Sequence, residues 1–288
     1  SATVEPGRLV RGLRRVALEL GVRIHEKSPM RRLTPGGQPG VETEGGSVTA
    51  GSVVLATNAC SAMIPELRRR MAVVGRAIVA TRPMAESLAE LGLDHGVAIS
   101  DSRLFTHYYR TTADGRLIFG KGGGDFVFGS SVGGTFEGES VYRKRIEAVM
   151  QWFYPSLASG DCVQSWSGPI DRSMTGLPMF GELRSHPGVF YGFGYSGNGV
   201  GPTFVGGRIL ASLALRRQDE WSEAPLVGAH CETFPPEPFR YLGARLIKGA
   251  LMRKEQAEDR GRAPRRLDVA LSALMPGGLV PVEKGKSR

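Results

Sequence analysis

A short aromatic strand that breaks into glycines and then becomes a helix constrains the fold of this chain more than any other stretch. It covers residues 189–215, VFYGFGYSGNGVGPTFVGGRILASLAL. Aromatic and β-branched residues favour a strand at its start, and Gly194, Gly197 and Gly199 allow a sharp turn because they carry no Cβ. After Pro202 the apolar residues recur at helical spacing and predict one buried stripe, which consists of Phe204, Val205, Ile209, Leu210 and Leu213. Because a strand end and a helix start direct several unpaired N–H groups at one point, we expect this turn to bind an anionic or electron-rich ligand group.

A second apolar strand is predicted over residues 52–56, SVVLA. Such a run is typical of a strand that is buried on both faces of a parallel sheet. It ends in Thr57 and Asn58, and ligands of α/β sheets bind at the carboxyl ends of strands. Two interpretations stay open: Thr57 and Asn58 hydrogen-bond a cofactor, or they cap the following turn. Upstream, the pattern predicts a helix from Pro6 to Gly21, strands at 22–26 and 31–33, and a hairpin of 40–44 with 47–50.

Between residues 61 and 134 the pattern changes to consecutive strands with tight turns, which indicates an antiparallel sheet. The strands are predicted at 73–82, 97–100, 105–111 and 116–120. Strand alternation places Tyr108 and Arg110 on one face and His107 on the other. Arg110 with Tyr108 would clamp a substrate carboxylate, because guanidinium is a planar fork of donors; the alternative is a surface arginine packed on an aromatic ring. We interpret His107 as structural, since no acid or nucleophile partner can be identified near it.

Downstream of this sheet the sequence predicts a helix over 140–154 and a strand over 162–166. Trp166, at the end of that strand, would supply a wall for a flat ligand. The glycines and prolines of residues 167–183 indicate a path that crosses between two structural units. A last helix is predicted over 267–274.

Cysteine use and charge bear on the class of function. Cys60, Cys162 and Cys231 are odd in number and widely spaced, which favours reduced and mostly buried thiols over disulfides or a zinc site. Residues 240–288 hold 12 Lys and Arg against five Asp and Glu, and so carry +7 of the net charge of +9. Because the signs mix at helical spacings, we interpret this tail as a solvated helical face and do not expect nucleic-acid binding. No apolar run has the length of a membrane span and no leader is recognisable, so a cytoplasmic location is the expectation.

The sequence shows no catalytic side chains of its own. It contains no nucleophile elbow, no cluster with metal-ligand spacing and no pair of catalytic carboxylates, so we assign no catalytic residue and no metal ligand. An enzyme with this sequence would take its reactive group from a cofactor.

Five blocks of the chain carry a resemblance to a known family. They are PGRLVRGLRRVALELGVRIHEKSPM, SVVLATNA, YYRTTADGRLIFG, WSGPIDRSMTGLPMFG and GYSGNGVGPTFVGGRILA, in this order. The sequence resembles the FAD-dependent amino-acid and amine oxidoreductases, which include D-amino-acid, glycine, sarcosine and γ-glutamylputrescine oxidases. The resemblance implies a mixed α/β fold in which an incomplete FAD-binding domain is interleaved with an antiparallel-sheet substrate domain. We expect FAD-binding parts at 1–60 and 186–218, the substrate domain at 61–185, and a basic helical extension at 219–288.

The resemblance also implies the site residues. The expected FAD-binding residues are Met30, Ala56, Thr57, Asn58, Ala59, Gly194, Tyr195, Ser196, Gly197, Asn198, Gly199 and Val200. The loop 194–200 matches the one beneath the pyrimidine end of the flavin ring, where amides at a helix start would stabilise the negative charge of the reduced ring. Tyr108, Arg110 and Trp166 are expected to bind the substrate, a small amine or amino acid. Its C–N bond would be oxidised by hydride transfer to flavin, and oxygen or another acceptor would reoxidise the flavin.

The sequence departs from the family in three places. The family opens with a strand, a GxGxxG turn and a helix that bind the pyrophosphate, and this sequence opens instead with a helix that normally follows that unit. We therefore expect it to be the carboxyl-terminal part of a longer flavoprotein, with weak or no FAD binding by itself. Asn198 stands where many relatives carry His, and Gly201 where sarcosine oxidases carry a Lys, which argues against sarcosine as substrate. The alternatives are a non-catalytic interaction module and one subunit of a split flavoenzyme.

Overall fold

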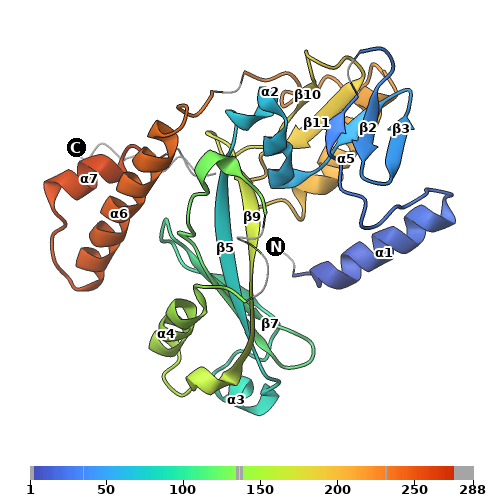
Figure 1. Cartoon of the computed structure of the whole chain (residues 1–288). Helices are drawn as coiled ribbons and strands as arrows, with labels where there is room; N and C mark the ends of the chain where they lie inside the picture. Colours follow the sequence, from blue (N-terminus) through green and yellow to red (C-terminus); the bar gives the residue numbers. More distant parts are fainter. Residues whose placement is uncertain (1–2, 35, 134–135, 137–138, 231, 276–288) are drawn as a thin grey trace. The chain divides into compact units, whose positions relative to one another are not determined.

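The chain has a mixed α/β fold and divides into two compact units (Figure 1). The computed structural model describes residues 3–34, 36–133, 136, 139–230 and 232–275. Unit 1 comprises Ser1–Asn58, Pro178–Phe193 and Asn198–His230, and unit 2 comprises Ala59–Leu177, Gly194–Gly197 and Cys231–Arg288. Each unit is therefore assembled from three stretches of the chain, so segments far apart in the sequence share one core.

Unit 1 holds two three-stranded sheets and two helices. Its elements are α1 (Pro6–Glu19), β1 (Arg32–Leu33), β2 (Gly40–Thr43), β3 (Gly46–Thr49), β4 (Val53–Leu55), β10 (Met179–Glu182), β11 (Val189–Phe193) and α5 (Pro202–Ala214). The first sheet has the order β1-β2-β3 and is antiparallel, which confirms the predicted hairpin. The second has the order β10-β11-β4, with β11 parallel to β4, and α5 packs against all three of its strands. The carboxyl ends of β4 and β11 thus lie at the same edge.

Two predicted features of burial in unit 1 are wrong. β4 is an edge strand rather than a strand covered on both faces, and Val54 is 42% exposed. In α5 the residues Ile209 and Leu210 are buried, but Phe204 and Val205 are exposed at 69% and 42%. Helical spacing gives the apolar face of a helix, but it does not say which part of that face has a neighbour.

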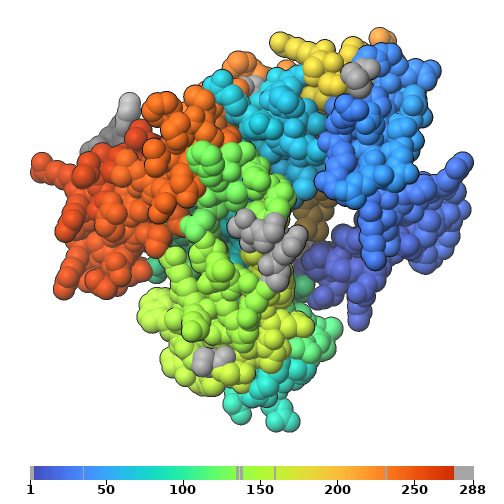
Figure 2. All heavy atoms as spheres, in the orientation of Figure 1, coloured from blue at the N-terminus to red at the C-terminus, as the bar shows by residue number. Residues whose placement is uncertain are grey.

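Helix α1 is amphipathic, but none of its residues is buried. Its apolar face, formed by Leu9, Leu13 and Val16, is 41–62% exposed, and Leu20 beyond its end is 79% exposed. In the space-filling view the helix, dark blue, lies uncovered on the side in view (Figure 2). The strand predicted over 22–26 is also wrong: this stretch pairs with no described strand and forms turns and extended backbone, so it lacks the ladder that a strand needs.

Unit 2 is built on one five-stranded antiparallel sheet of order β6-β7-β8-β5-β9. Its strands are β5 (Ala72–Thr81), β6 (Ala98–Ser100), β7 (His107–Thr111), β8 (Leu117–Lys121) and β9 (Cys162–Arg172). Its helices are η1 (Asn58–Met63, from the last residue of unit 1), α2 (Pro65–Arg68), α3 (Ala85–Glu90), η2 (Phe128–Ser130), α4 (Arg143–Phe153), η4 (Ser159–Asp161), α6 (Phe239–Asp259) and α7 (Arg266–Ser272). The predicted strands of this region and the helices near 140–154 and 267–274 are confirmed, with ends shifted by a few residues.

One face of this sheet carries the core of unit 2. Val79, Leu117, Phe119, Ile146 and Met150 are all at most 2% exposed, and α4 packs on β5 and β8 through them. β9 is longer than predicted, because the stretch read as a crossing path continues the strand to Arg172. Pro169 lies within it and pairs in register with Gly75. A proline is tolerated there because β9 is an edge strand, where the missing N–H has no partner to lose.

The described cysteines correct one detail of the prediction. Cys162 is buried and Cys60 is exposed, and both are free thiols. Cys231 lies outside the described residues. Within the described part of the chain, no helix is both long and apolar enough to cross a membrane.

Candidate functional site

The candidate substrate residues share the face of the unit 2 sheet that lies opposite the core. Strand register places Tyr108 beside Gly120, Gly120 beside Ile78, and Ile78 beside Trp166, so one row crosses β7, β8, β5 and β9. Arg110 occupies the next position along β7 on the same face. Tyr108 and Arg110 are half-buried, and Trp166 is 41% exposed. The alternation predicted from the sequence thus brings all three residues to one surface, here called the open face.

A glycine shapes the centre of the open face. A Cβ at Gly120 would lie 2.4 Å from the Tyr108 ring, so only glycine lets this ring lie across the neighbouring strand. Arg76 of β5 contacts the other part of the ring, with its guanidinium carbon 6.0 Å from the ring centroid. Burial raises the pKa of the Tyr108 phenol, although Arg76 lowers it in part. The phenol is therefore neutral and can donate a hydrogen bond at physiological pH.

Two arginines of the open face were missed by the sequence prediction. Arg76 lies on β5 and Arg172 on β9, on the same face as Arg110. Burial lowers the pKa of Arg172, and the nearby Arg76 lowers it further, which shows that the two cations sit close enough to repel. A signal for Arg76 was present, because it is the one charged residue in the otherwise apolar β5. The open face therefore carries more positive charge than the predicted Arg110 alone.

The glycine loop that follows β11 is held against β9. Its residues Gly194–Gly197 belong to unit 2, and Asp171 accepts a hydrogen bond from the Gly194 amide at 2.6 Å. Ser196 accepts one from the Ser173 amide at 3.2 Å. Gly197 has a φ of +91°, and a Cβ there would lie 3.1 Å from Ile170, an open-face residue. The turn therefore packs beside the open face, and glycine is required for both its conformation and its close approach.

The side chain of Asp171, which was not among the predicted site residues, holds this loop in place. Its side chain is 1% exposed, and the amides of Gly194, Tyr195 and Ser196 all point at its carboxylate. Burial raises the pKa of Asp171, and these amides offset only part of the shift. The first three amides of the loop thus bind Asp171 within the protein, and a ligand would bind the amides from Gly197 onward.

Asp171→Asn is expected to change how stability depends on pH. A carboxyl whose folded-state pKa is raised binds its proton more tightly in the folded protein than in the unfolded chain. Its contribution to the free energy of unfolding is therefore largest below the unfolded pKa, and it falls as the pH rises through the folded pKa. Asn keeps the shape but does not titrate, so this slope disappears. Urea unfolding between pH 4 and 8 measures it; a wild-type-minus-variant difference that does not vary with pH would contradict the assignment.

His107 is not the isolated structural residue that the sequence predicted. Its Nδ1 lies 2.5 Å from Asp101 Oδ2, and its Nε2 lies 2.6 Å from Lys121 Nζ. Asp101 precedes β7 in a turn, and Lys121 is the cross-strand neighbour of His107 on β8. The prediction failed because a cross-strand partner depends on register, which a single strand pattern does not give.

The predicted cofactor residues are distributed over both units. In unit 1, Ala56, Thr57 and Asn58 are exposed at the carboxyl end of β4, and Met30 is half-buried. Asn58 has a φ of +48°, so the chain turns sharply there. Asn198, Gly199 and Val200 precede α5 in unit 1, whereas Ala59 and the residues from Gly194 to Gly197 belong to unit 2. No group of three or more potential metal ligands occurs among the described residues.

The carboxyl end of β4 is exposed, whereas the chain directly after β11 is buried or half-buried as far as Ser196. Both strands end at one edge of a parallel pair, which is where α/β sheets bind ligands, and Thr57 and Asn58 are exposed there. The glycines of the loop leave room for a flat ring to approach the backbone. Polar groups exposed at the carboxyl end of a strand fit the binding of a cofactor such as FAD.

Comparison with known proteins gives one family. The family model described as FAD dependent oxidoreductase matches residues 1–213. A probable oxidoreductase OrdL of Haemophilus influenzae is 31% identical over 210 residues, which is 71% of this chain and 45% of that protein. The gamma-glutamylputrescine oxidoreductase of Escherichia coli is 30% identical over 195 residues, which is 67% of this chain and 43% of that protein. The chain thus spans less than half the length of these curated relatives.

A solved structure supports the fold. The glycine oxidase of Geobacillus kaustophilus aligns with 73% of this chain and 54% of its own, with a TM-score of 0.56 and 21% sequence identity.

Proposed function

Because the chain belongs to the FAD dependent oxidoreductase family, we propose that it forms part of a flavoenzyme that oxidises the C–N bond of a small amine or amino acid. The observation that carries this proposal is the open face of unit 2, where Tyr108, Arg110 and Trp166 share one surface with the glycine loop packed at Ile170. A flavoenzyme needs a loop that contacts the flat cofactor and, next to that loop, a strand surface that binds the substrate. The amine or amino-acid class also agrees with the names of two similar proteins, gamma-glutamylputrescine oxidoreductase and glycine oxidase.

FAD would be held by the loop and by the end of β4. In this proposal Gly197, Asn198, Gly199 and Val200 present backbone amides to the ring, and Ala56, Thr57 and Asn58 line the remainder of the cofactor. When bound, the flavin supplies the hydride acceptor for the carbon beside the substrate nitrogen. Asp171 keeps the first half of the loop in place, so the amides that face the ring stay preorganised.

The substrate would be held by side chains of the open face. Arg110 binds its carboxylate through charge-assisted hydrogen bonds, and the neutral Tyr108 phenol adds a directed donor. Arg76 and Arg172 add positive charge to the same surface and favour an anionic substrate group. Trp166 forms an apolar wall that excludes water on one side. These residues supply positioning rather than proton transfer, so no side-chain base is required on the open face.

The flavoenzyme that we propose contains sequence beyond this chain. The chain spans less than half the length of its curated relatives. The apolar face of α1 is open, as it would be if another segment packs on it in the complete flavoprotein. We therefore expect the chain alone to bind FAD weakly, and the complete protein to bind it with the visible absorption of a flavoprotein.

Arg110→Ala is expected to weaken the binding of carboxylate substrates. Loss of hydrogen bonds to a charged group costs about 1.5–3 kcal/mol, which corresponds to roughly a 10- to 150-fold higher KM for an amino acid. The KM for the matching amine without the carboxylate should stay unchanged. Steady-state kinetics of the flavin-loaded complete protein measure both values.

Arg116→Ala provides a matched control, because Arg116 flanks β8 and pairs with Asp114 of the β7–β8 turn. It should leave both KM values unchanged. If the flavin-loaded Arg110→Ala protein has unaltered kinetics toward amino acids, Arg110 does not bind the substrate carboxylate. If the complete protein carries no flavin, the proposed function itself is wrong.

A further inference from the structure

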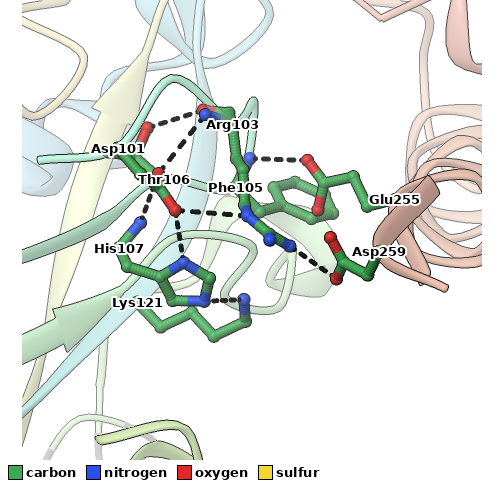
Figure 3. Close-up of polar contacts among 8 residues, drawn as sticks. All are labelled: Asp101, Arg103, Phe105, Thr106, His107, Lys121, Glu255 and Asp259. Carbon is green, nitrogen blue, oxygen red and sulfur yellow. Dashed lines mark hydrogen bonds and ion pairs between the residues drawn. The ribbon is translucent and has the colours of Figure 1, made fainter. Parts of the chain in front are cut away.

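A second polar cluster lies on the other face of the unit 2 sheet, away from the open face. Figure 3 shows Asp101, His107 and Lys121 in a line, with the imidazole between the carboxylate and the amine. Asp101 also accepts the His107 backbone N–H at 2.9 Å, so the carboxylate and the ring are fixed relative to one another. The ring is 3% exposed and packs edge-on against Phe153 at 5.2 Å between centroids. The imidazole therefore has one orientation.

The partners of the ring determine its tautomer. A carboxylate only accepts hydrogen bonds, so Nδ1 carries a proton that it donates to Asp101. The lone pair of Nε2 then faces the Lys121 amine, which donates to it at 2.6 Å. If a proton passes from Lys121 to His107, the same hydrogen bond persists in the reverse direction and Asp101 stabilises the imidazolium. This is the arrangement of an activated nucleophile: a nucleophile, a base within hydrogen-bond reach, and a third group that orients the base.

The Lys121 amine borders a cavity of about 410 Å³ between the sheet and α6. The charged residues that line the cavity are Arg103, Lys121, Arg145, Arg253, Glu255 and Asp259. Four are cations and two are anions, and Asp259 is already paired with Arg103 at 2.6 Å. Arg145 has no carboxylate partner among the described residues and contacts only the Met252 sulfur, at 3.7 Å. Arg253 is likewise paired with Asp268 at 2.7 Å, so Arg145 is the cation through which this cavity would hold a small anion.

The surroundings of Lys121 also favour its uncharged form. Burial lowers the pKa of the Lys121 ammonium, Arg145 and Arg103 lower it further, and Glu255 opposes them. Burial likewise lowers the pKa of His107, which keeps its Nε2 unprotonated and able to accept. A larger fraction of the amine is thus nucleophilic than for a lysine on the surface.

We propose that Lys121 is a nucleophilic lysine that forms an imine with a small anionic aldehyde or 2-oxo acid bound in this cavity. The ligand carboxylate would bind near Arg145, which places its carbonyl carbon near Nζ. Lys121 transfers a proton to His107 Nε2, and its uncharged amine attacks the carbonyl carbon to form a carbinolamine. The carbinolamine oxygen then takes up a proton and leaves as water, so a C=N bond replaces the C=O bond without oxidation or reduction. This activity is independent of the proposed function, because it needs no flavin and uses the opposite face of the sheet.

Reductive trapping with glyoxylate and cyanoborohydride tests the proposal on the chain as it is. Peptide mass spectrometry should find carboxymethylation at Lys121 roughly tenfold faster than at Lys144, an exposed lysine on α4 that serves as the internal reference. His107→Gln keeps a hydrogen-bond partner but removes the base, and should lower the rate at Lys121 to that at Lys144. Labelling of the unaltered protein decides the matter even if this variant folds poorly: equal rates at Lys121 and Lys144 would overturn the proposal.

A neutral aldehyde separates the amine from the anion site. Propionaldehyde should label Lys121 ahead of Lys144 by a smaller factor than glyoxylate does, because it gains nothing from the cations of the cavity. Arg145→Ala should slow glyoxylate at Lys121 severalfold and leave propionaldehyde unchanged. If the variant slows both aldehydes equally, or neither, the cavity is not the binding site of the anion and that part of the proposal fails.

Discussion

Gly124→Ala is expected to cost more than about 3 kcal/mol of the free energy of unfolding, or to prevent folding of unit 2. A Cβ at this position would lie 1.4 Å from the carbonyl oxygen of Gly75 in β5. Both groups are backbone, so no side-chain rotation relieves the overlap. The two segments would have to separate, and the hydrogen bond from the Gly75 amide to the Asp125 carbonyl, 2.9 Å in length, would be lost with them.

Gly168→Ala is the matched control. Gly168 lies in β9 of the same sheet, and a Cβ there would meet nothing within 4 Å. Its effect on stability should stay within about 0.5 kcal/mol. Chemical denaturation followed by tryptophan fluorescence reports on unit 2, because Trp152 and Trp166 belong to it. A Gly124→Ala protein as stable as the control would show that the two backbones are farther apart than the structure places them.

The contact between Gly124 and Gly75 could not be predicted from the sequence, whereas the sheet that contains Gly75 could. The many glycines between residues 120 and 133 indicate a connection between strands, but they do not indicate how it packs. The sheet beside it was predictable because β5 is a long run of residues that favour strands, and because a short turn joins β7 to β8. The close approach of Gly124 to Gly75 joins residues far apart in the sequence, and no local pattern records it.

The candidate site divides in the same way. The open-face position of Tyr108 and Arg110 follows from strand alternation alone, and the register of four strands adds Trp166 to their row. Asp171 was missed because its partners are backbone amides of a loop that follows β11, and backbone amides leave no mark in a sequence. His107 was misjudged for a related reason, since Lys121 reaches it across a strand pair. Long-range polar contacts were thus the hardest part of the site to predict.

Burial was harder to predict than secondary structure. The helical spacing of α1 was correct, but none of its residues is buried. β4 was a correct strand with an exposed Val54. An amphipathic pattern indicates that one face of an element is apolar, but it does not indicate that a neighbouring element covers that face. Both elements belong to unit 1, and both agree with the proposal that further sequence completes the flavoprotein.

The basic tail, in contrast, was expected to be a solvated helix, but one arginine in its first turn is buried. Arg240 of α6 is 7% exposed and donates to the carbonyl oxygens of Arg68 and Met71 at 3.1 and 3.0 Å. Its other nitrogens bind Glu237 at 2.9 and 2.7 Å. Glu237 in turn accepts the amide of Gly129 at 3.0 Å. One arginine thus joins α6 to the segment between α2 and β5.

Arg240→Ala is therefore expected to lower the free energy of unfolding by about 2–3 kcal/mol, because it leaves the half-buried Glu237 carboxylate without its counter-charge and the carbonyl oxygens of Arg68 and Met71 without their donor. Arg245→Ala is the control on the same helix, since Arg245 is exposed and contacts only the Tyr241 hydroxyl at 3.4 Å; its effect should stay within about 0.5 kcal/mol. The double variant Arg240→Met with Glu237→Gln should be more stable than Arg240→Ala, because no charge is then left unpaired.

The cost of Arg240→Ala should also depend on pH. Burial raises the pKa of Glu237, but hydrogen bonds from Arg240, Gly129 and Tyr241 outweigh it and hold the pKa below its ordinary value. A lowered folded-state pKa contributes stability above the unfolded pKa, and this stability is lost as the pH falls through the folded pKa. Without Arg240, burial dominates and protonation relieves the buried charge. The difference between wild type and variant should therefore shrink from pH 7 to pH 4 in urea denaturation; a constant difference would show that Arg240 stabilises α6 through its two carbonyl contacts rather than through its charge.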